Sequence, residues 1–427
     1  MIGPSNIATK NDLKVYNGTI NVNAVDDALR GGDSVTIGND TDTDFSTLNI
    51  TLKTTAGDGI KANDTDTTSG KGFITVNGGK VNVTAFSDGM HASQALNING
   101  GDITVKTSAT SSGDTSAKGL KAGCTDENGT AVTGVIAING GNIDVDSTDD
   151  CIHASGNITL YGGVMQLNSG DDAVHSDADV TIGQGSNTFD DVLILVEAGY
   201  EGIEGLNITQ NSGTVISNTT DDGYNAAGGA DGSGNTSPGG WGGGWGGGFG
   251  GGGGNYSLNL KGGFSLVNTA NGDHDGFDSN GSLTISGGYM ITNGNEPFDC
   301  DGTLSYTGGV YVKNTGSGGM GGGFGGGMGG GSMTQSVSAS VSANAGTRVT
   351  ICDGSGKEIV SFIADKADSS VIAGSTAYTG ATVYTGGTLQ GSTYFQEIDQ
   401  TQLAAYGGTL QGGTQASGSA GGNTSWW

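Results

Sequence analysis

The sequence predicts an all-β protein whose main part is a right-handed parallel β-helix, in which short strands coil around one axis. Three observations predict this fold: a four-residue phrase recurs along the chain, Gly-Gly pairs recur in step with it, and apolar residues alternate after each pair. Alternation with period two is typical of strands that bury one face. Glycine and asparagine allow the positive φ angles that sharp corners need, so three short strands with a small residue at each corner describe one coil.

The recurring phrase has an acid or lysine, a small residue, an apolar residue and a polar residue. Its first positions, here called the anchor column, are Asp27, Asp58, Asp88, Lys118, Asp150, Asp172, Glu201, Asp222, Asp275 and Glu296. The shortest steps between anchors, 21 and 22 residues, set the length of one coil, and longer steps carry insertions. Stacked hairpins are the alternative, but they need a two-residue turn at every reversal and a regular short period, which the pattern does not show.

The Gly-Gly corners keep phase with the anchors. They open segments such as NGGKVNV (77–83), NGGDITV (99–105), NGGNIDV (139–145), YGGVMQL (161–167), KGGFSLV (261–267), SGGYMIT (286–292) and TGGVYVK (307–313). A further strand often precedes the corner, as in LNING (96–100). Each coil is therefore expected to place one strand before the corner, one after it and one at the anchor phrase.

The chain is expected to divide into four parts. A lead covers 1–12, the β-helix covers 13–331 with Gly-rich insertions at about 228–254 and 316–331, a C-terminal β element covers 332–398, and a flexible tail covers 399–427. In the C-terminal element, alternating segments flank Asp353-Gly354-Ser355-Gly356, which indicates a hairpin turn. The lead lacks the apolar core of a signal peptide, so a signal segment is not expected within this sequence.

Composition narrows the class of partner. Among 427 residues, 43 acids outnumber 15 lysines and arginines, giving a net charge of −28. This excess argues against nucleic acid or an anionic membrane as a partner, because phosphates are neutralised by clustered basic residues. No apolar run is long enough for a membrane span. The four cysteines lack paired CxxC spacing and are expected to be structural thiols, with one or two disulfides as the alternative.

The anchor acids predict a calcium site. Equivalent positions of successive coils stack about 4.8 Å apart, and two carboxylates at that spacing repel by roughly 3 kcal/mol at an effective dielectric constant of about 20. Ca²⁺ suits such oxygen-rich sites. The candidate ligands are Asp27, Asp58, Asp88, Asp149, Asp150, Asp171, Asp172, Asp221, Asp222 and Asp275. The alternative is that these aspartates shape the corners through Asx turns, with Lys118 neutralising Asp88 or Asp150.

Three positions after each anchor lies a second column of polar residues. It contains Arg30, Lys61, His91, Lys121, His153, His175, Glu204, Asn225 and Asp278. Lys61, His91, Lys121, His153 and His175 are candidates for hydrogen bonds to sugar hydroxyls. A zinc site at His153 and His175 and a solvent-facing polar ladder are the alternatives. Lys61, Lys118 and Lys121 are also candidate bases for a polysaccharide lyase, but arginine is almost absent and we expect no catalysis.

Two glycine tracts, 239–254 and 318–332, place a large apolar residue at every fourth position. Flat aromatic rings stack on the C–H faces of sugars, so Trp241 and Trp245 are candidates for a carbohydrate platform. The alternative is a pair of loops whose bulky residues fold back onto the β-helix.

The phrases DGIKA, DGMHAS, DDCIHAS and DDAVHS, the phased NGG corners, the glycine tracts and a C-terminal SSVIAG…YTGGT together resemble a carbohydrate-binding β-helix family. Its members come from plant-wall-degrading and gut bacteria and are similar to polysaccharide lyases in fold. The resemblance covers roughly 13–390. It implies a secreted or cell-surface protein that binds calcium and plant-wall polysaccharide, cellulose or acidic pectic chains, without established cleavage. The calcium ligands would carry over to Asp58, Asp88, Asp150, Asp172 and Asp222, whereas Lys118 and Glu296-Pro297 depart from the pattern.

The sequence therefore predicts a non-catalytic, calcium-dependent binder of cellulose or polygalacturonate. Calcium would bridge carboxylates of the protein to those of an acidic glycan. The alternatives are a calcium-dependent pectate-type lyase and an adhesin or assembly subunit that associates with itself.

Overall fold

The computed structural model describes residues 6–109, 117–185, 189–227, 255–270, 274–294, 296–315, 331–334, 337–367, 369–375, 378, 380–395, 403–420 and 423–426. These residues form strands and turns and contain no helix, so the prediction of an all-β chain is confirmed. They fall into two compact units. The first unit holds residues up to Gly183 and Ile194–Leu206, and the second holds Gln184–Leu193, Asn207–Ala227 and the described residues after 254. All four cysteines are free thiols.

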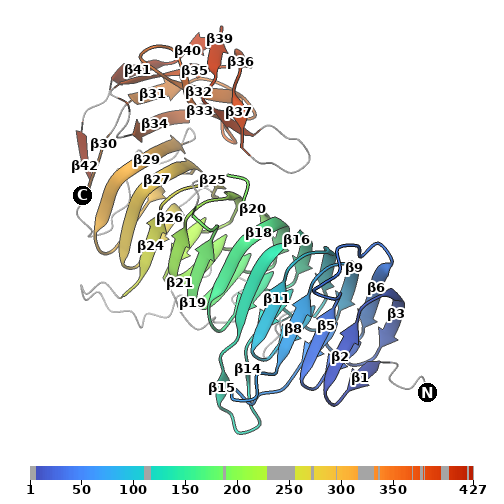
Figure 1. Ribbon diagram of the computed structural model, residues 1–427. Helices are drawn as coiled ribbons and strands as arrows, with labels where there is room; N and C mark the ends of the chain where they lie inside the picture. Colours follow the sequence, from blue (N-terminus) through green and yellow to red (C-terminus); the bar gives the residue numbers. More distant parts are fainter. Residues whose placement is uncertain are drawn as a thin grey trace. The chain divides into compact units, whose positions relative to one another are not determined.

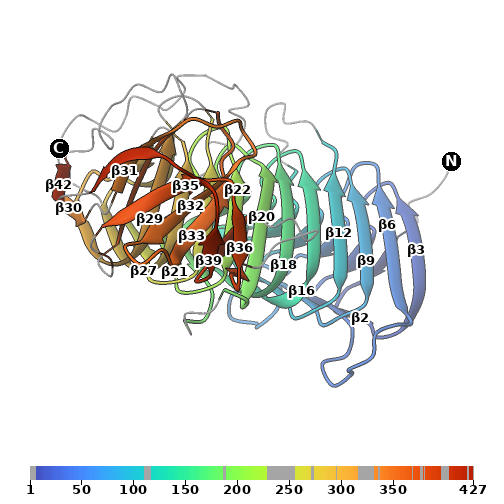
Figure 2. The same ribbon diagram turned by 90° about the horizontal axis from the view of Figure 1, so that it is seen from above.

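The first unit consists of three columns of parallel strands (Figures 1 and 2). The column that follows the anchors contains β1 (Ile7–Thr9), β4 (Leu29–Gly31), β7 (Ile60–Ala62), β10 (Met90–Ala92), β13 (Leu120–Ala122), β17 (Ile152–Ala154) and the start of β19 (Val174–Ile182). The next contains β2 (Asp12–Val15), β5 (Ser34–Ile37), β8 (Phe73–Val76), β11 (Ala95–Ile98) and parts of β16 (Val135–Ser147), β18 (Ile158–Ser169) and β19. The third contains β3 (Gly18–Ala24), β6 (Leu48–Thr54), β9 (Lys80–Ala85), β12 (Asp102–Thr107), β16 and β18.

Each strand in a column pairs in parallel with the equivalent strand one coil further along the chain. The apolar residue two positions after the anchor is buried on every coil of the first unit, from Leu29 and Ile60 to Val174. Each coil therefore contributes one strand to each column, as the predicted coil requires. That this coil is a right-handed parallel β-helix stays a prediction. A short hairpin of β14 (Cys124–Thr125) and β15 (Ala131–Val132) lies in the insertion after β13.

The Gly-Gly corners stack as the sequence predicts. The second glycines, Gly79, Gly101, Gly141 and Gly163, have φ values of 93°, 110°, 102° and 92°. Side chains are excluded there for a second reason, because a Cβ on Gly101 would lie 2.9 Å from the carbonyl oxygen of Gly79 on the preceding coil. The stacked corners thus expose backbone without side chains.

The second unit repeats the same arrangement with larger core residues. Its columns contain β22 (Thr214–Asn218), β25 (Phe264–Asn268), β27 (Ser282–Asn293) and β29 (Leu304–Thr315); the end of β21 (Ile203–Gln210), β24 (Ser257–Leu260), β27 and β29; and β23 (Tyr224–Ala226), β26 (Asp275–Ser279) and β28 (Glu296–Phe298). β20 (Val192–Ala198) precedes them in the chain. Tyr224, Phe277 and Phe298 stack in succession through the core of this unit.

Antiparallel strands follow β29. β34 (Ser369–Ser375) pairs with β29 and with β31 (Val337–Val341), which pairs with β41 (Ser417–Ala420). A second sheet contains β32 (Arg348–Asp353), β33 (Glu358–Ile363), β35 (Ala381–Thr385), β37 (Thr393–Tyr394), β38 (Ala404–Tyr406) and β40 (Thr414–Gln415). Two smaller pairs are β36 (Thr388–Gln390) with β39 (Thr409–Gln411) and β30 (Gly331–Thr334) with β42 (Asn423–Trp426). β32 and β33 form the predicted hairpin, in which Asp353 Oδ1 accepts hydrogen bonds from the backbone of Ser355 and Lys357.

Two segments that the sequence leaves outside the regular structure contain strands. β1 lies in the predicted lead and pairs with β4. β38 lies in the predicted flexible tail, but it pairs with β33 and buries Ala404 and Ala405. Small, polar and glycine-rich composition suggested a tail, and long-range pairing overrides that local signal.

Candidate functional site

The anchor carboxylates tie successive coils together through the backbone. The amide N–H of Asp58 donates to Asp27 Oδ1 at 3.0 Å, that of Asp88 donates to Asp58 Oδ1 at 3.0 Å, and that of Lys118 donates to Asp88 Oδ1 at 2.9 Å. The same bond recurs from Asp172 to Asp150, from Glu201 to Asp172 and, in the second unit, from Asp275 to Asp222. One oxygen of each of these aspartates therefore has a structural role between coils.

The other oxygen meets the basic residues of the second column. Lys61 Nζ lies 2.7 Å from Asp58 Oδ2, Lys121 Nζ lies 3.1 Å from Asp88 Oδ2, and His91 Nδ1 lies 3.4 Å from both carboxylates. Burial would raise the pKa of Asp58, but His91 and Lys61 hold it well below its ordinary value. On these coils the basic side chains offset the repulsion that the sequence suggested a cation would offset.

The coils of His153 and His175 differ, because imidazoles replace lysines in the second column. His153 Nδ1 lies 2.8 Å from Asp150 Oδ2, and His175 Nδ1 lies 3.1 Å from Asp172 Oδ2 and 2.6 Å from Glu204 Oε2. Burial and the charges of Asp150 and Glu204 raise the pKa of Asp172 well above its ordinary value, despite its hydrogen bond to His175. Lys118 pairs with Asp150, as the sequence suggested.

In the second unit the second column itself becomes acidic. Asn225 pairs in register with Asp278, and one carboxylate oxygen each of Asp275, Asp278 and Asp299 lie within 4.8 Å of one another. Burial, followed by the charge of Asp299, raises the pKa of Asp278 from 3.8 to about 7. Burial likewise raises the pKa of Asp222 well above its ordinary value. This is a crowded site of oxygen donors.

A groove of about 780 Å³ runs over the Gly-Gly corners of the first unit. Gly78-Gly79, Gly100-Gly101, Gly140-Gly141 and Gly163 form its floor on successive coils. Since adjacent coils lie about 4.8 Å apart, the four corners span roughly 14 Å. The glycines of the floor have no side chains, so a ligand could lie close to it along several coils.

Polar side chains and one ring edge this groove. Asn77 stands on one edge and is hydrogen-bonded to Asn99 at 2.8 Å. Lys80 and Asp102 stand on the other edge, in register on adjacent strands. The half-buried ring of Phe45 lies over Gly78 at one end, where a Cβ on this glycine would meet the ring at 2.2 Å.

The predicted sugar contacts in the second column are only partly accessible. The side chains of Lys61, His91 and Lys121 are 30%, 14% and 24% exposed, whereas His153 and His175 are 10% and 3% exposed. His153 and His175 are therefore buried against carboxylates and have little exposed surface for contact with a sugar. Trp241 and Trp245 lie outside the described residues.

The predicted metal ligands separate into different environments. Asp27, Asp58 and Asp88 face basic residues, Asp149, Asp150 and Asp171 form one close group, and Asp172 joins His175. In the second unit Asp221 contacts His274, while Asp222 and Asp275 are linked to each other through a backbone N–H.

Sequence reasoning missed Asp278 and Asp299 as members of a carboxylate cluster, and Phe45, Asn77 and Lys80 as groove residues. The change from lysine and histidine to acids in the second column was a usable signal for Asp278. The recurring NGG triplets marked the groove, but they were interpreted as corners alone. Phe45 has no counterpart in the repeat, so no pattern singled it out.

Comparison with known proteins bears on the first unit. A family model described as "Carbohydrate-binding domain-containing protein" matches residues 4–173, which include every residue that lines the groove. No curated protein and no solved structure matches the chain. The match supports a carbohydrate-binding protein with a polysaccharide partner. Within the described part of the chain, no helix has the length and apolar character to cross a membrane.

Proposed function

We propose that this protein binds a polysaccharide without cleaving it, and that the glycan chain lies in the groove over the Gly-Gly corners. One observation carries the proposal: the groove follows successive coils and lies wholly within the segment that matches a carbohydrate-binding family. The right-handed parallel β-helix is part of the same proposal, since its repeating coils present equivalent groups in a row.

The chemistry of the groove suits an extended neutral glycan such as cellulose. One coil step of about 4.8 Å is close to the length of one sugar unit in an extended chain, so successive sugars would meet equivalent groups. Asn77 and Asn142 carry amides that both donate and accept hydrogen bonds, as sugar hydroxyls do. The ring of Phe45 would stack on a C–H face of a terminal sugar.

An acidic pectic chain would need help from a cation, because the protein carries a net charge of −28. We propose calcium at Asp275, Asp278 and Asp299, whose close carboxylates supply the oxygen donors that calcium prefers, with Asp222 nearby. Bound there, calcium would neutralise the crowded carboxylates and stiffen the second unit. The anchors Asp58 and Asp88 fit calcium less well, because both of their oxygens already have partners.

The environment of Lys61 supports a binding protein over a lyase. Burial would lower the pKa of Lys61, but Asp58 raises it above its ordinary value, so the ammonium keeps its proton. A lysine in that state is a poor base for removing the proton next to a uronate carboxyl. A polysaccharide of the plant cell wall also places the protein outside the cell, secreted or on the cell surface.

The test is binding of the full chain to cellulose and to soluble cello-oligosaccharides, followed by pull-down and calorimetry. Phe45→Ala and Asn77→Ala should each weaken binding by about tenfold, the loss expected for one stacked ring or one good hydrogen bond. Phe86→Ala is the matched control, because Phe86 is 39% exposed and does not line the groove. Equal binding by wild type and both groove variants would place the glycan elsewhere. Release of unsaturated products from polygalacturonate would instead establish a lyase.

A further inference from the structure

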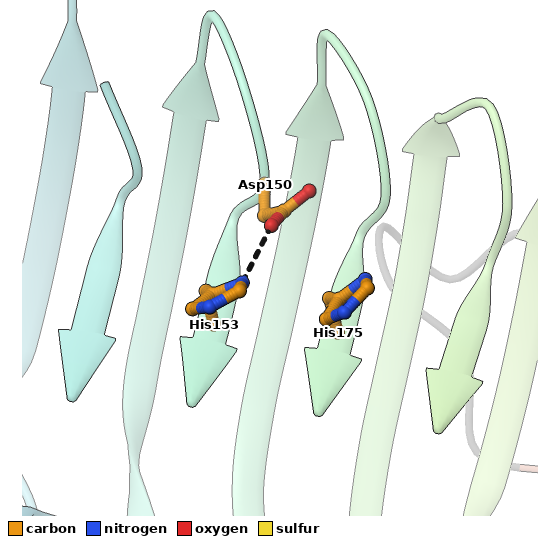
Figure 3. Close-up of side chains that lie close together, drawn as sticks. All are labelled: Asp150, His153 and His175. Atoms are coloured by element: carbon orange, nitrogen blue, oxygen red, sulfur yellow. Dashed lines mark hydrogen bonds and ion pairs between the residues drawn. The ribbon is translucent and has the colours of Figure 1, made fainter. Parts of the chain in front are cut away.

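His153 and His175 form a buried pair of imidazoles on adjacent coils. They lie opposite each other in the parallel register of β17 and β19. Their rings stack with centroids 5.0 Å apart and planes inclined by 17°. Figure 3 shows the rings side by side, with the Asp150 carboxylate hydrogen-bonded to His153. The glycan groove does not use either residue.

Several donor atoms converge on these rings. One donor atom each of Asp150, His153 and His175 lie within 4.8 Å of one another, and the same holds for Asp172, His175 and Glu204. His175 belongs to both groups. Two groups of ring nitrogens and carboxylate oxygens, joined at His175, therefore span three successive coils.

The cluster carries more acid than base. The carboxylates at ion-pair distance are those of Asp149, Asp150, Asp172, Asp177 and Glu204, and they share the basic groups of Lys118, His153 and His175. Asp149, Asp150 and Asp172 are 3%, 0% and 6% exposed. Excess negative charge out of water is unfavourable unless a cation offsets it. A divalent ion would supply that charge.

A neighbouring pair of coils shows the contrasting arrangement. Asp58, Asp88 and His91 also bring donor atoms within 4.8 Å of one another. There, however, Lys61 Nζ lies 2.7 Å from Asp58 and Lys121 Nζ lies 3.1 Å from Asp88. Each of these two carboxylates therefore has its own ammonium group, whereas near His153 and His175 the single Lys118 ammonium is shared by Asp149 and Asp150. The same columns thus provide an internal comparison in which lysine takes the place of the second imidazole.

We propose that Asp150, His153, His175 and Glu204 form a binding site for a divalent transition ion of the zinc class. Two imidazole nitrogens with two carboxylate oxygens match the donors and the number of ligands that zinc prefers, whereas calcium takes oxygen ligands. Asp172 adds a further carboxylate beside the site, because its Oδ2 lies 3.1 Å from the same His175 Nδ1 that contacts Glu204. The ion fastens three successive coils and is independent of glycan binding.

The experiment uses the full, untagged chain after removal of metal with a chelator. Zn²⁺ is titrated by calorimetry, and Co²⁺ is titrated by visible absorption, which reports four-coordinate nitrogen and oxygen ligation. We expect one equivalent of either ion at this site and a higher melting temperature with zinc. His153→Ala and His175→Ala should each weaken zinc binding by at least about 100-fold, more than the loss of a residue that only orients a ligand. His91→Ala, the matched control, should leave binding unchanged.

Circular dichroism of each metal-free variant checks that it folds. If an alanine variant does not fold, the double variant His153→Gln/Glu204→Gln is used in its place. The proposal is overturned if zinc does not bind stoichiometrically, or if binding survives the loss of both histidines. It is also overturned if calcium at equal concentration displaces zinc, because that result would identify an all-oxygen site. His153→Ala should bind cellulose as the wild type does, so that a failure of the zinc proposal can be distinguished from a failure of the glycan groove.

Discussion

Replacing Asp278 by asparagine should stabilise the calcium-free protein at neutral and alkaline pH. Burial and the neighbouring Asp299 raise the pKa of Asp278 to about 7, whereas the ordinary value is 3.8. The folded state therefore holds the proton more tightly than the unfolded state. Stability from this group is greatest below pH 4, falls between about pH 4 and 7, and stays low above pH 7.

The size of the effect follows from the shift in pKa. Each unit corresponds to about 1.4 kcal/mol, so the difference between 3.8 and about 7 amounts to roughly 4 kcal/mol between pH 4 and pH 8. About 3 kcal/mol of this loss falls between pH 5 and pH 8. Asp278→Asn removes the charge and should remove this part of the pH dependence.

The assay is urea unfolding in a chelator at pH 5 and pH 8, for wild type, Asp278→Asn and the exposed-site control Asp144→Asn. Wild type and the control should lose stability toward pH 8, and Asp278→Asn should lose about 3 kcal/mol less. Calcium should restore stability to wild type at pH 8 and have a smaller effect on Asp278→Asn. An equal pH dependence in wild type and Asp278→Asn would refute the assignment of this carboxylate as crowded and uncompensated.

Two further predictions concern the coil itself. Asp58→Ala should cost roughly 3 to 5 kcal/mol in urea unfolding, because it leaves the Asp88 amide without its acceptor and Lys61 without its carboxylate; a loss no larger than that of Asp144→Ala would contradict the structural role of the anchor. Gly101→Ala should lower the free energy of unfolding by more than Gly129→Ala, since both glycines have positive φ but only Gly101 would bring its Cβ to 2.9 Å from a carbonyl oxygen. Equal effects at the two glycines, measured by the same unfolding assay, would show that stacking of the corners adds no constraint.

The columns of the fold could be predicted because the recurring anchor phrase sets their register. The anchor phrase fixes which apolar residue points inward, so Ile60, Met90 and Leu120 occupy equivalent buried positions, as their spacing from the anchors indicates. The C-terminal strands were harder to predict, because β38 depends on pairing with β33, a partner distant in sequence. Local composition does not indicate which distant strand will be the partner.

The candidate sites were less predictable than the columns for a different reason. The sequence shows that carboxylates stack, but it does not show which oxygen meets a backbone N–H and which meets a side chain. Asp88 illustrates this: one oxygen accepts the Lys118 amide and the other faces Lys121. The groove was invisible because glycines make it by lacking side chains, and only the stacked corners reveal the space above them.

The residue three positions after each anchor decides what the anchor carboxylate can do. Where it is lysine, as at Lys61, an ammonium neutralises the acid and the coil has no need of an ion. Where two successive coils both carry histidine, as at His153 and His175, nitrogen donors join the carboxylates and favour a transition ion. Where it is aspartate, as at Asp278, the donors are oxygens alone and favour calcium. A lysine at position 278 should therefore abolish the dependence of stability on calcium while leaving zinc binding intact, and loss of both responses in Asp278→Lys would show that one residue per coil does not set the choice of ion.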